Sequence, residues 1–345
     1  MERIEARILH EVATSSKTFW ELLKEVDAPL SDILAAIEKL ENKGFIAAEK
    51  GKFCITENGK ARINSEALSL KVKVCLSCSG KRIIPGGRFK KVLKVFKEIV
   101  RKRPEPSLDF FQGYMLETDV VARAAFMHYY GDLEEKSIVL IGDDDLLSIA
   151  LALTGLPKKI VVLDIDRRLG DFLKRVNEDY CLDIKFFEYD VSGPLPKELK
   201  EKFDVVSSEP LETVSGLKAF ILRGVACLKS GGSGYFGLTN YEASLKKWLK
   251  VQELLVKTKC VITDIIQGFS VYPTKYGKID YDEFATRFRP DIGKNPGINW
   301  YKSALIRFEL LGKARSHAGD KRIKIDYIDS EELSHPEYFK IFHGN

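Results

Sequence analysis

The chain has 345 residues, 45% of them hydrophobic, and a formal net charge of only +5 although 30% of its residues are charged. This length can bury the cores of about two domains and excludes a peptide-scale scaffold. The near balance of acidic and basic residues does not by itself indicate a nucleic-acid-binding protein. Glutamine is rare beside abundant lysine and glutamate, which is typical of thermophile proteins. Neither a long apolar run nor a signal-peptide pattern occurs, so we expect a cytoplasmic location and no membrane partner.

Residues 1–68 are expected to form a winged-helix domain. Apolar residues recur at helical spacing in three stretches, and two short strand-like runs then flank a turn at Gly51. The third stretch, residues 30–41, carries more acidic than basic side chains, which suits packing or dimerisation better than insertion into a DNA groove. We therefore expect a homodimer and do not favour nucleic acid as a partner. Nucleic-acid binding is kept as the alternative, because Lys50 and Lys52 in the wing could contact phosphate groups.

Residues 69–106 are expected to form a basic linker or pre-domain that contains the motif Cys75-x-x-Cys78. This spacing is that of half a zinc site, but zinc needs about four ligands, and neither a second cysteine pair nor a nearby His-x-x-His follows. A disulfide or two plain thiols fits better, and we expect no metal. Apolar residues at helical spacing over 89–99 indicate that the positive charges there form the solvated face of a helix.

Residues 107–345 are expected to form the catalytic domain, an α/β fold with a doubly wound parallel sheet. A short uncharged strand over 137–141 breaks at Gly142 and is followed by three aspartates and a helix. Later strands also end in acidic residues, and ligands of open α/β sheets bind at such strand ends. We therefore expect one crevice to collect the acidic residues Asp143, Asp144, Asp145, Asp164, Asp166, Asp190 and Glu209.

The negative charge of this crevice indicates the kind of ligand. Three consecutive aspartates would repel a pyrophosphate, which a dinucleotide site instead meets with glycine-rich backbone amides. A cationic nucleoside without phosphates, such as a sulfonium nucleoside, fits better, together with a cationic second substrate. The alternative is that an aspartate only caps the following helix, but one residue would serve that purpose.

These residues resemble those of the branched-chain polyamine synthases, or bis(aminopropyl)spermidine synthases, of archaea and thermophilic bacteria. The resemblance spans most of the chain and is carried by Gly142-Asp143-Asp144-Asp145-Leu146, by Asp164-Ile165-Asp166, and by a winged helix followed by Cys75-x-x-Cys78-x-Gly80. It implies a Rossmann-like, methyltransferase-type catalytic domain without a resident cofactor. It also implies aminopropyl transfer from decarboxylated S-adenosylmethionine, the co-substrate, to the secondary amine of spermidine or a related polyamine. The implied products are aminopropylspermidine, bis(aminopropyl)spermidine and methylthioadenosine.

The resemblance also implies roles for individual residues. In the related spermidine synthases a catalytic aspartate precedes a Ser-Ser-Asp-Pro stretch, whereas Val206 occupies that place here. The base must then come from elsewhere, and we assign Asp145 as the principal base, with Asp143 and Asp144 orienting the polyamine. The residues expected to bind the donor nucleoside are Gly142, Asp164, Asp166 and Asp190.

Further acids and aromatic residues are expected to bind the acceptor polyamine, namely Glu209, Glu212, Tyr281 and Asp282. A long cation could lie against such rings, and Trp300-Tyr301 follows nearby. The alternative is that these aromatic residues belong to the core and that the charges are solvated. Residues 325–345, rich in acidic and aromatic side chains, form either a mobile lid or a tail.

Two other functions use the same sheet. One is an S-adenosylmethionine-dependent methyltransferase that acts on nucleic acid, with the winged helix as its reader. Such amino-methylating enzymes generally carry an Asn or Asp, then Pro-Pro and an aromatic residue, and Ser208-Glu209-Pro210-Leu211 does not supply this motif. The other is a non-catalytic regulator in which the winged helix binds DNA and the α/β domain senses a nucleoside or a polyamine.

Overall fold

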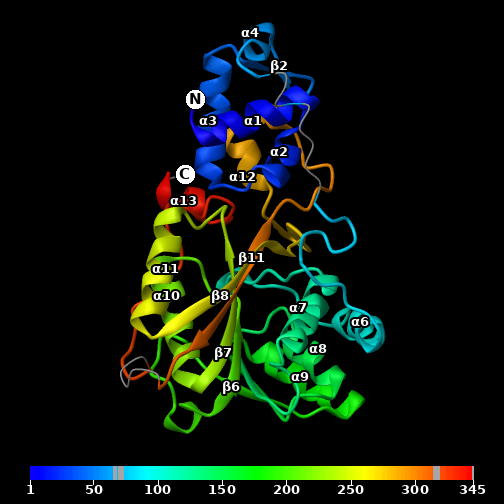
Figure 1. The fold of residues 1–345 in the computed structure, drawn as a ribbon, viewed down its shortest axis with the longest axis vertical. Helices are drawn as coiled ribbons and strands as arrows, with labels where there is room; N and C mark the ends of the chain where they lie inside the picture. Colours follow the sequence, from blue (N-terminus) through cyan, green and yellow to red (C-terminus); the bar gives the residue numbers. More distant parts are fainter. Residues whose placement is uncertain (65–67, 69–73, 314–318, 344–345) are drawn as a thin grey trace.

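The computed structural model describes residues 1–64, 68, 74–313 and 319–343. A helical N-terminal region lies on one end of a larger α/β region, as Figure 1 shows. The domain boundary expected after residue 68 adjoins residues 69–73, which are outside the described residues. The domain limits therefore stay a prediction.

Three helices and a hairpin make up the N-terminal region. They are α1 (Arg3–Thr14), α2 (Phe19–Glu25), α3 (Leu30–Asn42), β1 (Ile46–Glu49) and β2 (Lys52–Ile55), followed by the short α4 (Glu57–Lys60). Thr18 and Glu21 form a capping box at the start of α2, which satisfies backbone N–H groups that the helix leaves free. The helices and the hairpin that the sequence predicts are present, and their classification as a winged helix stays a prediction.

Seven strands form the central sheet in the order β5, β4, β3, β6, β7, β11, β8. Their bounds are β3 (Ser137–Ile141), β4 (Lys159–Asp164), β5 (Ile184–Glu188), β6 (Phe203–Ser208), β7 (Leu228–Thr239), β8 (Cys260–Val271) and β11 (Lys302–Leu310). Strands β3 to β7 are parallel, and β11 runs antiparallel to both β7 and β8. The chain changes direction across the sheet between β3 and β6, where ligands of such folds bind. The predicted Rossmann-like, methyltransferase-type sheet is confirmed.

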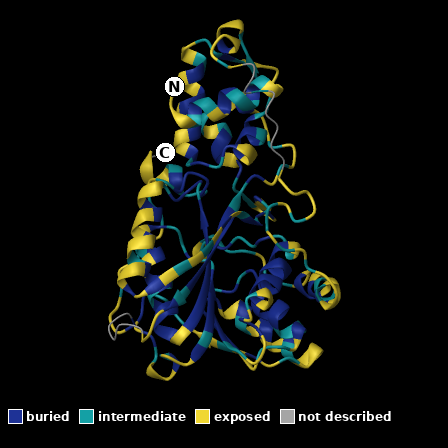
Figure 2. Ribbon diagram, in the orientation of Figure 1, coloured by how far each residue is buried: buried dark blue, intermediate teal, exposed yellow. Residues whose placement is uncertain are grey.

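Helices cover both faces of this sheet (Figure 1). One face carries α7 (Glu117–Tyr129), α8 (Leu147–Thr154) and α9 (Arg167–Tyr180), with α6 (Arg88–Val100) packed outside; the other carries α10 (Val214–Cys227) and α11 (Leu245–Lys257). Successive strand residues point to opposite faces, so Ile138 and Leu140 join the first core while Val139 and Ile141 join the second. Figure 2 shows the central strands of the sheet buried, the edge strand β8 partly exposed, and the outer sides of α6 and α11 exposed.

The C-terminal third of the chain links the α/β region to the N-terminal helices. Its short elements are β9 (Lys275–Tyr276), β10 (Ile279–Asp280), α12 (Glu283–Phe288), η3 (Pro290–Ile292) and α13 (Tyr338–Phe342). Two short 3₁₀ helices lie earlier in the chain, η1 (Leu108–Phe110) and η2 (Lys197–Leu199). Phe284, Trp300 and Tyr338 are buried in one core with Trp20 of α2. This shared core joins the two regions. Within the described ranges, no helix is long and apolar enough to span a membrane.

Cys75 and Cys78 lie in a turn before α6 and are both free thiols, so the plain-thiol alternative is the one observed. The two basic residues after the motif hold this turn against the edge strand β8. Lys81 Nζ donates a hydrogen bond of 2.6 Å to the carbonyl of Phe269, and Arg82 forms an ion pair with Asp264. The positive charge of this segment is thus partly used in packing.

Candidate active site

A cavity of about 850 Å³ lies at the carboxyl ends of β3, β4, β6 and β7, the position expected for a ligand in this fold. Nine carboxylates line it, and none of the described lining residues is a lysine or an arginine. The acids are Asp109, Asp144, Asp164, Asp190, Glu209, Glu212, Glu242, Glu332 and Glu337. The cavity is therefore suited to a cation.

The turn between β3 and α8 separates the three consecutive aspartates. Gly142 has φ +74° and Leu146 has φ +59°, so the backbone twists sharply between them. Asp143 faces away from the cavity, because its carboxylate accepts hydrogen bonds from the backbone N–H of Ser148, at 3.1 Å, and from the Ser148 hydroxyl. It thus serves the first turn of α8, which is the helix-capping role that the sequence left open.

Asp144 is the aspartate of the triplet that lines the cavity. Its Oδ2 accepts a hydrogen bond of 3.1 Å from the backbone N–H of Gly113. Burial and the nearby charge of Asp164 raise the pKa of Asp144 to about 7. A carboxylate that titrates near neutral pH can exchange a proton with a bound ligand.

Asp145 is buried behind the lining. Its Oδ1 accepts a hydrogen bond of 2.6 Å from the backbone N–H of Met115, whereas its buried Oδ2 has no hydrogen-bond partner in the described chain. Burial and the charge of Asp144 raise its pKa well above the usual range for an aspartate. The geometry therefore favours Asp144 over Asp145 as the carboxylate that meets a ligand.

The acids after β4 and β5 form the other side of the cavity. Asp164 is part of the lining, and its two oxygens accept hydrogen bonds from the backbone N–H groups of Asp143 (2.9 Å) and Asp166 (2.8 Å). Asp190 also lines the cavity and binds the N–H and hydroxyl of Ser192. Both carboxylates are thus fixed in orientation while remaining accessible.

Asp166 lies outside the lining, contrary to the expectation that all strand-end acids converge. Its carboxylate accepts hydrogen bonds from Gln112 at 2.9 Å and from Arg168 at 2.7 Å. Although burial opposes the effect, these bonds lower its pKa. Asp166 therefore joins the loop around Gln112 to the start of α9, and the convergence holds only for Asp144, Asp164, Asp190 and Glu209.

Glu209 follows β6 and is held from behind by buried groups. Arg123, in the middle of α7 and only 1% exposed, forms an ion pair with Glu209 Oε1. The hydroxyl of Tyr272 donates to Glu209 Oε2. A Cβ atom at Gly237 would overlap this carboxylate, so a glycine at 237 leaves the space that Glu209 fills.

A second group of acids, Glu212, Glu242 and Glu332, also lines the cavity. Glu212 binds the backbone N–H of Thr239, and Glu242 binds the hydroxyl of Tyr301 at 2.7 Å. Burial and the neighbouring Glu242 raise the pKa of Glu212 to about 8 and that of Glu332 to about 9. Burial thus favours the protonated form of Glu212 and Glu332, whereas a neighbouring ammonium group favours the ionised form.

The expected acceptor residues Tyr281 and Asp282 separate in the structure. Tyr281 lines the cavity, and its hydroxyl donates to the carbonyl of Gln112 at 3.0 Å. Asp282 is outside the lining because Trp300 Nε1, Thr274 and Asn295 donate to its carboxylate. Asp282 therefore orders the segment between β10 and β11, and Trp300 belongs to the core.

Several lining residues were not identified from the sequence. Tyr272 follows β8, Tyr276 is the last residue of β9, and Glu242 lies three residues after β7. Their places at strand ends would have indicated them, but these three strands were not predicted from the sequence. His335 and Glu332 come from the irregular C-terminal segment, whose path no local pattern predicts. His335 lies 4.9 Å from Phe111, ring to ring, and burial lowers its pKa to about 4.

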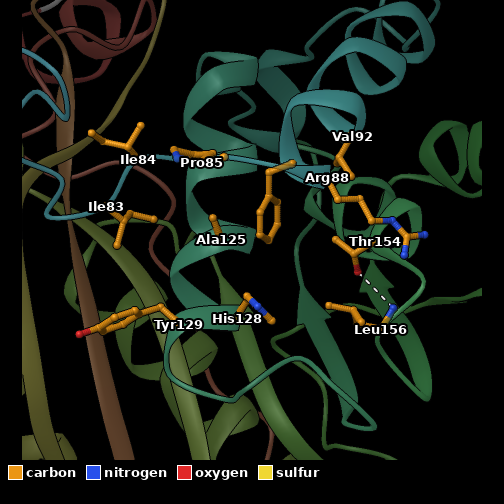
Figure 3. A pocket seen from close by; sticks show the side chains of 12 residues that line it. Ile83, Ile84, Pro85, Arg88, Val92, Ala125, His128, Tyr129, Thr154 and Leu156 are labelled. Carbon is orange, nitrogen blue, oxygen red and sulfur yellow. Dashed lines mark hydrogen bonds between the residues drawn. The ribbon is translucent and has the colours of Figure 1, made fainter.

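A separate hollow of about 700 Å³ lies beside α6 and α7. Figure 3 shows its lining, which includes Ile83, Ile84, Tyr129, His128 and Arg88. None of the described residues that line it is a carboxylate. This hollow therefore lacks the charge that distinguishes the cavity at the strand ends.

Comparison with known proteins agrees with this geometry. The family model described as the branched-chain polyamine synthase A C-terminal domain matches residues 91–334, which is more than half of the chain. The chain belongs to the branched-chain polyamine synthase family. The resemblance stated from the sequence is therefore confirmed.

Relatives in this family match nearly the full length. The N(4)-bis(aminopropyl)spermidine synthase of Thermococcus kodakarensis is 37% identical over 337 residues, covering 96% of this chain and 95% of the relative. That of Methanocaldococcus jannaschii is 37% identical over 332 residues, covering 95% and 93%. The solved branched-chain polyamine synthase of Thermus thermophilus, in complex with N4-aminopropylspermidine and 5'-methylthioadenosine, has a TM-score of 0.80 at 33% identity and covers 95% of this chain and 92% of its own.

Proposed function

We propose that the protein transfers aminopropyl groups from decarboxylated S-adenosylmethionine to the secondary amine of spermidine or a related polyamine. The products are the branched polyamine and methylthioadenosine. The observation that carries this proposal is the cavity with nine carboxylates and no described lysine or arginine in its lining, because both substrates are cations. The family relatives named for this activity support it.

The donor nucleoside is proposed to bind along the ends of β3, β4 and β5. Asp164 is oriented by backbone N–H groups and can accept hydrogen bonds from a ribose diol. Gly142 allows close approach of the ligand to the turn after β3, and Asp190 borders the place expected for the adenine. The sulfonium group then lies near Asp144, among the acids of the lining.

Asp144 is proposed to accept the proton of the attacking amine. The free electron pair of the amine nitrogen attacks the methylene carbon of the aminopropyl group, the carbon–sulfur bond breaks, and its electron pair stays on sulfur in methylthioadenosine. The proton released by the secondary amine passes to Asp144 Oδ, whose pKa near 7 suits both uptake and later release. Asp145, which was assigned as the base from the sequence, is then a buried neighbour of Asp144 behind the lining.

A second transfer to the resulting tertiary amine would release no proton. It would depend on positioning and on the field of the surrounding carboxylates, which stabilises a quaternary ammonium. Glu212, Glu242 and Glu332, together with Tyr281, are proposed to hold the terminal ammonium groups of the polyamine. A homodimer and a cytoplasmic location stay predictions.

The decisive test is turnover of the purified protein with decarboxylated S-adenosylmethionine and spermidine. We expect release of methylthioadenosine and formation of a branched polyamine, measured by chromatography and mass spectrometry. S-adenosylmethionine with nucleic acid is assayed in parallel. Methyl transfer in that assay, without release of methylthioadenosine in the first, would establish the methyltransferase function instead.

A further inference from the structure

Arg123 is a buried cation directly behind the acidic cavity. It lies in the middle of α7, a helix whose residues from Asp119 to Met127 are all buried. Burying an arginine costs free energy unless its charge is paired, and an apolar residue would pack in this position without that cost. Arg123 does not reach the lining itself.

Arg123 contacts the wall of the cavity through Glu209. Nη1 forms the ion pair with Glu209 Oε1, and Nη2 donates a hydrogen bond of 3.2 Å to Ser270 Oγ. Nε is buried without a hydrogen-bond partner in the described chain. The positive charge of the guanidinium is therefore paired with Glu209, and the hydrogen bond to Ser270 fixes the plane of the group.

Glu209 needs this partner because its other charged neighbours are acidic. Asp144 and Asp145 both interact electrostatically with Glu209, and each raises the cost of a further negative charge. The Tyr272 hydroxyl donates to Oε2 and completes the coordination of the carboxylate from behind. The side chain of Glu209 is still 20% exposed, toward the cavity that it lines.

We propose that Arg123 is a positioning residue that holds the Glu209 carboxylate oriented toward the acceptor polyamine. The inference rests on the proposed function and deepens it, because it assigns Glu209 and its buried partner to acceptor binding rather than to the donor nucleoside. Arg123 touches neither substrate and acts through Glu209. Without the guanidinium, Glu209 would lose the ion pair that fixes the direction of its carboxylate, and its contact with an ammonium group would weaken.

The test is a double-mutant cycle with Arg123→Met and Glu209→Gln. Arg123→Met should raise the KM for spermidine at least about tenfold, change kcat less, and leave the dissociation constant of methylthioadenosine within about twofold. Glu209→Gln should have a similar effect. Because Arg123 acts through Glu209, the double variant should be no worse than Glu209→Gln alone.

The double variant also distinguishes a loss of folding from a loss of spermidine binding. Arg123→Met alone leaves the Glu209 carboxylate without its ion pair, whereas the double variant removes both charges, so its melting temperature should lie closer to that of the wild type. The matched control is Arg307→Met with Asp132→Asn, a buried pair outside the cavity lining. This control should lower the melting temperature without changing the KM for spermidine. Arg123→Lys, which keeps the charge, should recover part of the spermidine affinity lost in Arg123→Met.

Two results would overturn the inference. One is additive losses of spermidine affinity from Arg123→Met and Glu209→Gln, since independent roles add. The other is a loss of methylthioadenosine binding as large as the loss of spermidine binding. If the wild type itself shows no aminopropyl transfer, the proposed function fails, and calorimetry of spermidine binding to the same variants still tests the link between Arg123 and Glu209.

Discussion

The ion pairs of two buried arginines in the α/β region, Arg307 with Asp132 and Arg123 with Glu209, differ in how completely their polar atoms are satisfied. Arg307 donates to Asp132 through Nε (3.1 Å) and Nη2 (2.9 Å), and Ser233 and Tyr235 donate to the same carboxylate. Around Arg123 and Glu209, in contrast, Arg123 Nε and Asp145 Oδ2 are buried without hydrogen-bond partners in the described chain. The closed network stabilises the fold, while the open one leaves polar atoms unsatisfied directly behind the wall of the cavity.

The largest effect is expected on catalysis, from a change in the cavity beside the Arg123–Glu209 pair. Asp144→Asn keeps the shape of the side chain but removes its ability to take a proton, so the first transfer should slow by about 10²-fold or more. Single-turnover rates at saturating spermidine provide the measurement. Asp132→Asn in the closed network should instead lower the melting temperature and leave the rate of the folded enzyme almost unchanged. Loss of turnover in Asp145→Asn but not in Asp144→Asn would return the role of base to Asp145.

Donor selectivity should follow from the same open, acidic lining. S-adenosylmethionine carries a carboxylate that would face Asp144 without a described lysine or arginine in the lining to pair with it. Calorimetry should therefore show that decarboxylated S-adenosylmethionine binds about tenfold more tightly or better. Tighter binding of the carboxylated donor would contradict the polyamine function and favour methyl transfer.

The nucleoside side of the cavity can be tested through Asp164. Asp164→Asn retains one carbonyl oxygen for the two backbone N–H donors and removes the charge, so donor affinity should fall about tenfold. The affinity for spermidine, measured in the same way, should stay nearly constant. Equal losses for both ligands would mean that the turn after β3 has been damaged, which the melting temperature would reveal independently.

The smallest effect is on the pH dependence of stability. In the folded protein the pKa is about 7 for Asp144, about 8 for Glu212 and about 9 for Glu332, all above the values of an unfolded chain. The folded state therefore holds protons that the unfolded state has released, and the free energy of unfolding should fall as pH rises from about 5 to 9. Thermal melts across this range measure the slope, which Asp144→Asn should reduce below pH 7. A melting temperature that rises steadily over the range would contradict these protonation states.

Much of the fold follows from local sequence patterns. The uncharged run over 137–141 and the glycine after it predict β3 and its turn, because a strand buried on both faces needs apolar residues throughout. The edge strand β8 and the antiparallel β11 were not identified from such patterns. Strand β8 alternates exposed and buried residues, and its pairing with β11 joins segments about 40 residues apart.

The site was predictable at the level of strand ends but not of side-chain direction. The acids after β3, β4, β5 and β6 were identified because parallel strands bring their carboxyl ends to one edge. Which aspartate of the triplet points into the cavity depends on the left-handed conformation of Leu146, an apolar residue that rarely adopts it. The partner of Glu209 could not be found, because Arg123 lies 86 residues earlier, in a helix with no motif of its own.

The glycine at position 237 limits which residues can stand at positions 209 and 237 together. The Glu209 carboxylate occupies the volume that a Cβ atom at position 237 would need, so a larger residue at 237 requires Glu209 to move or to be replaced. An alanine at 237 is compatible with a carboxylate at 209 only if that acid is shortened to aspartate or moved off its partner Arg123. Across related sequences, positions 209 and 237 should therefore co-vary, with a larger residue at one accompanied by a smaller acid at the other.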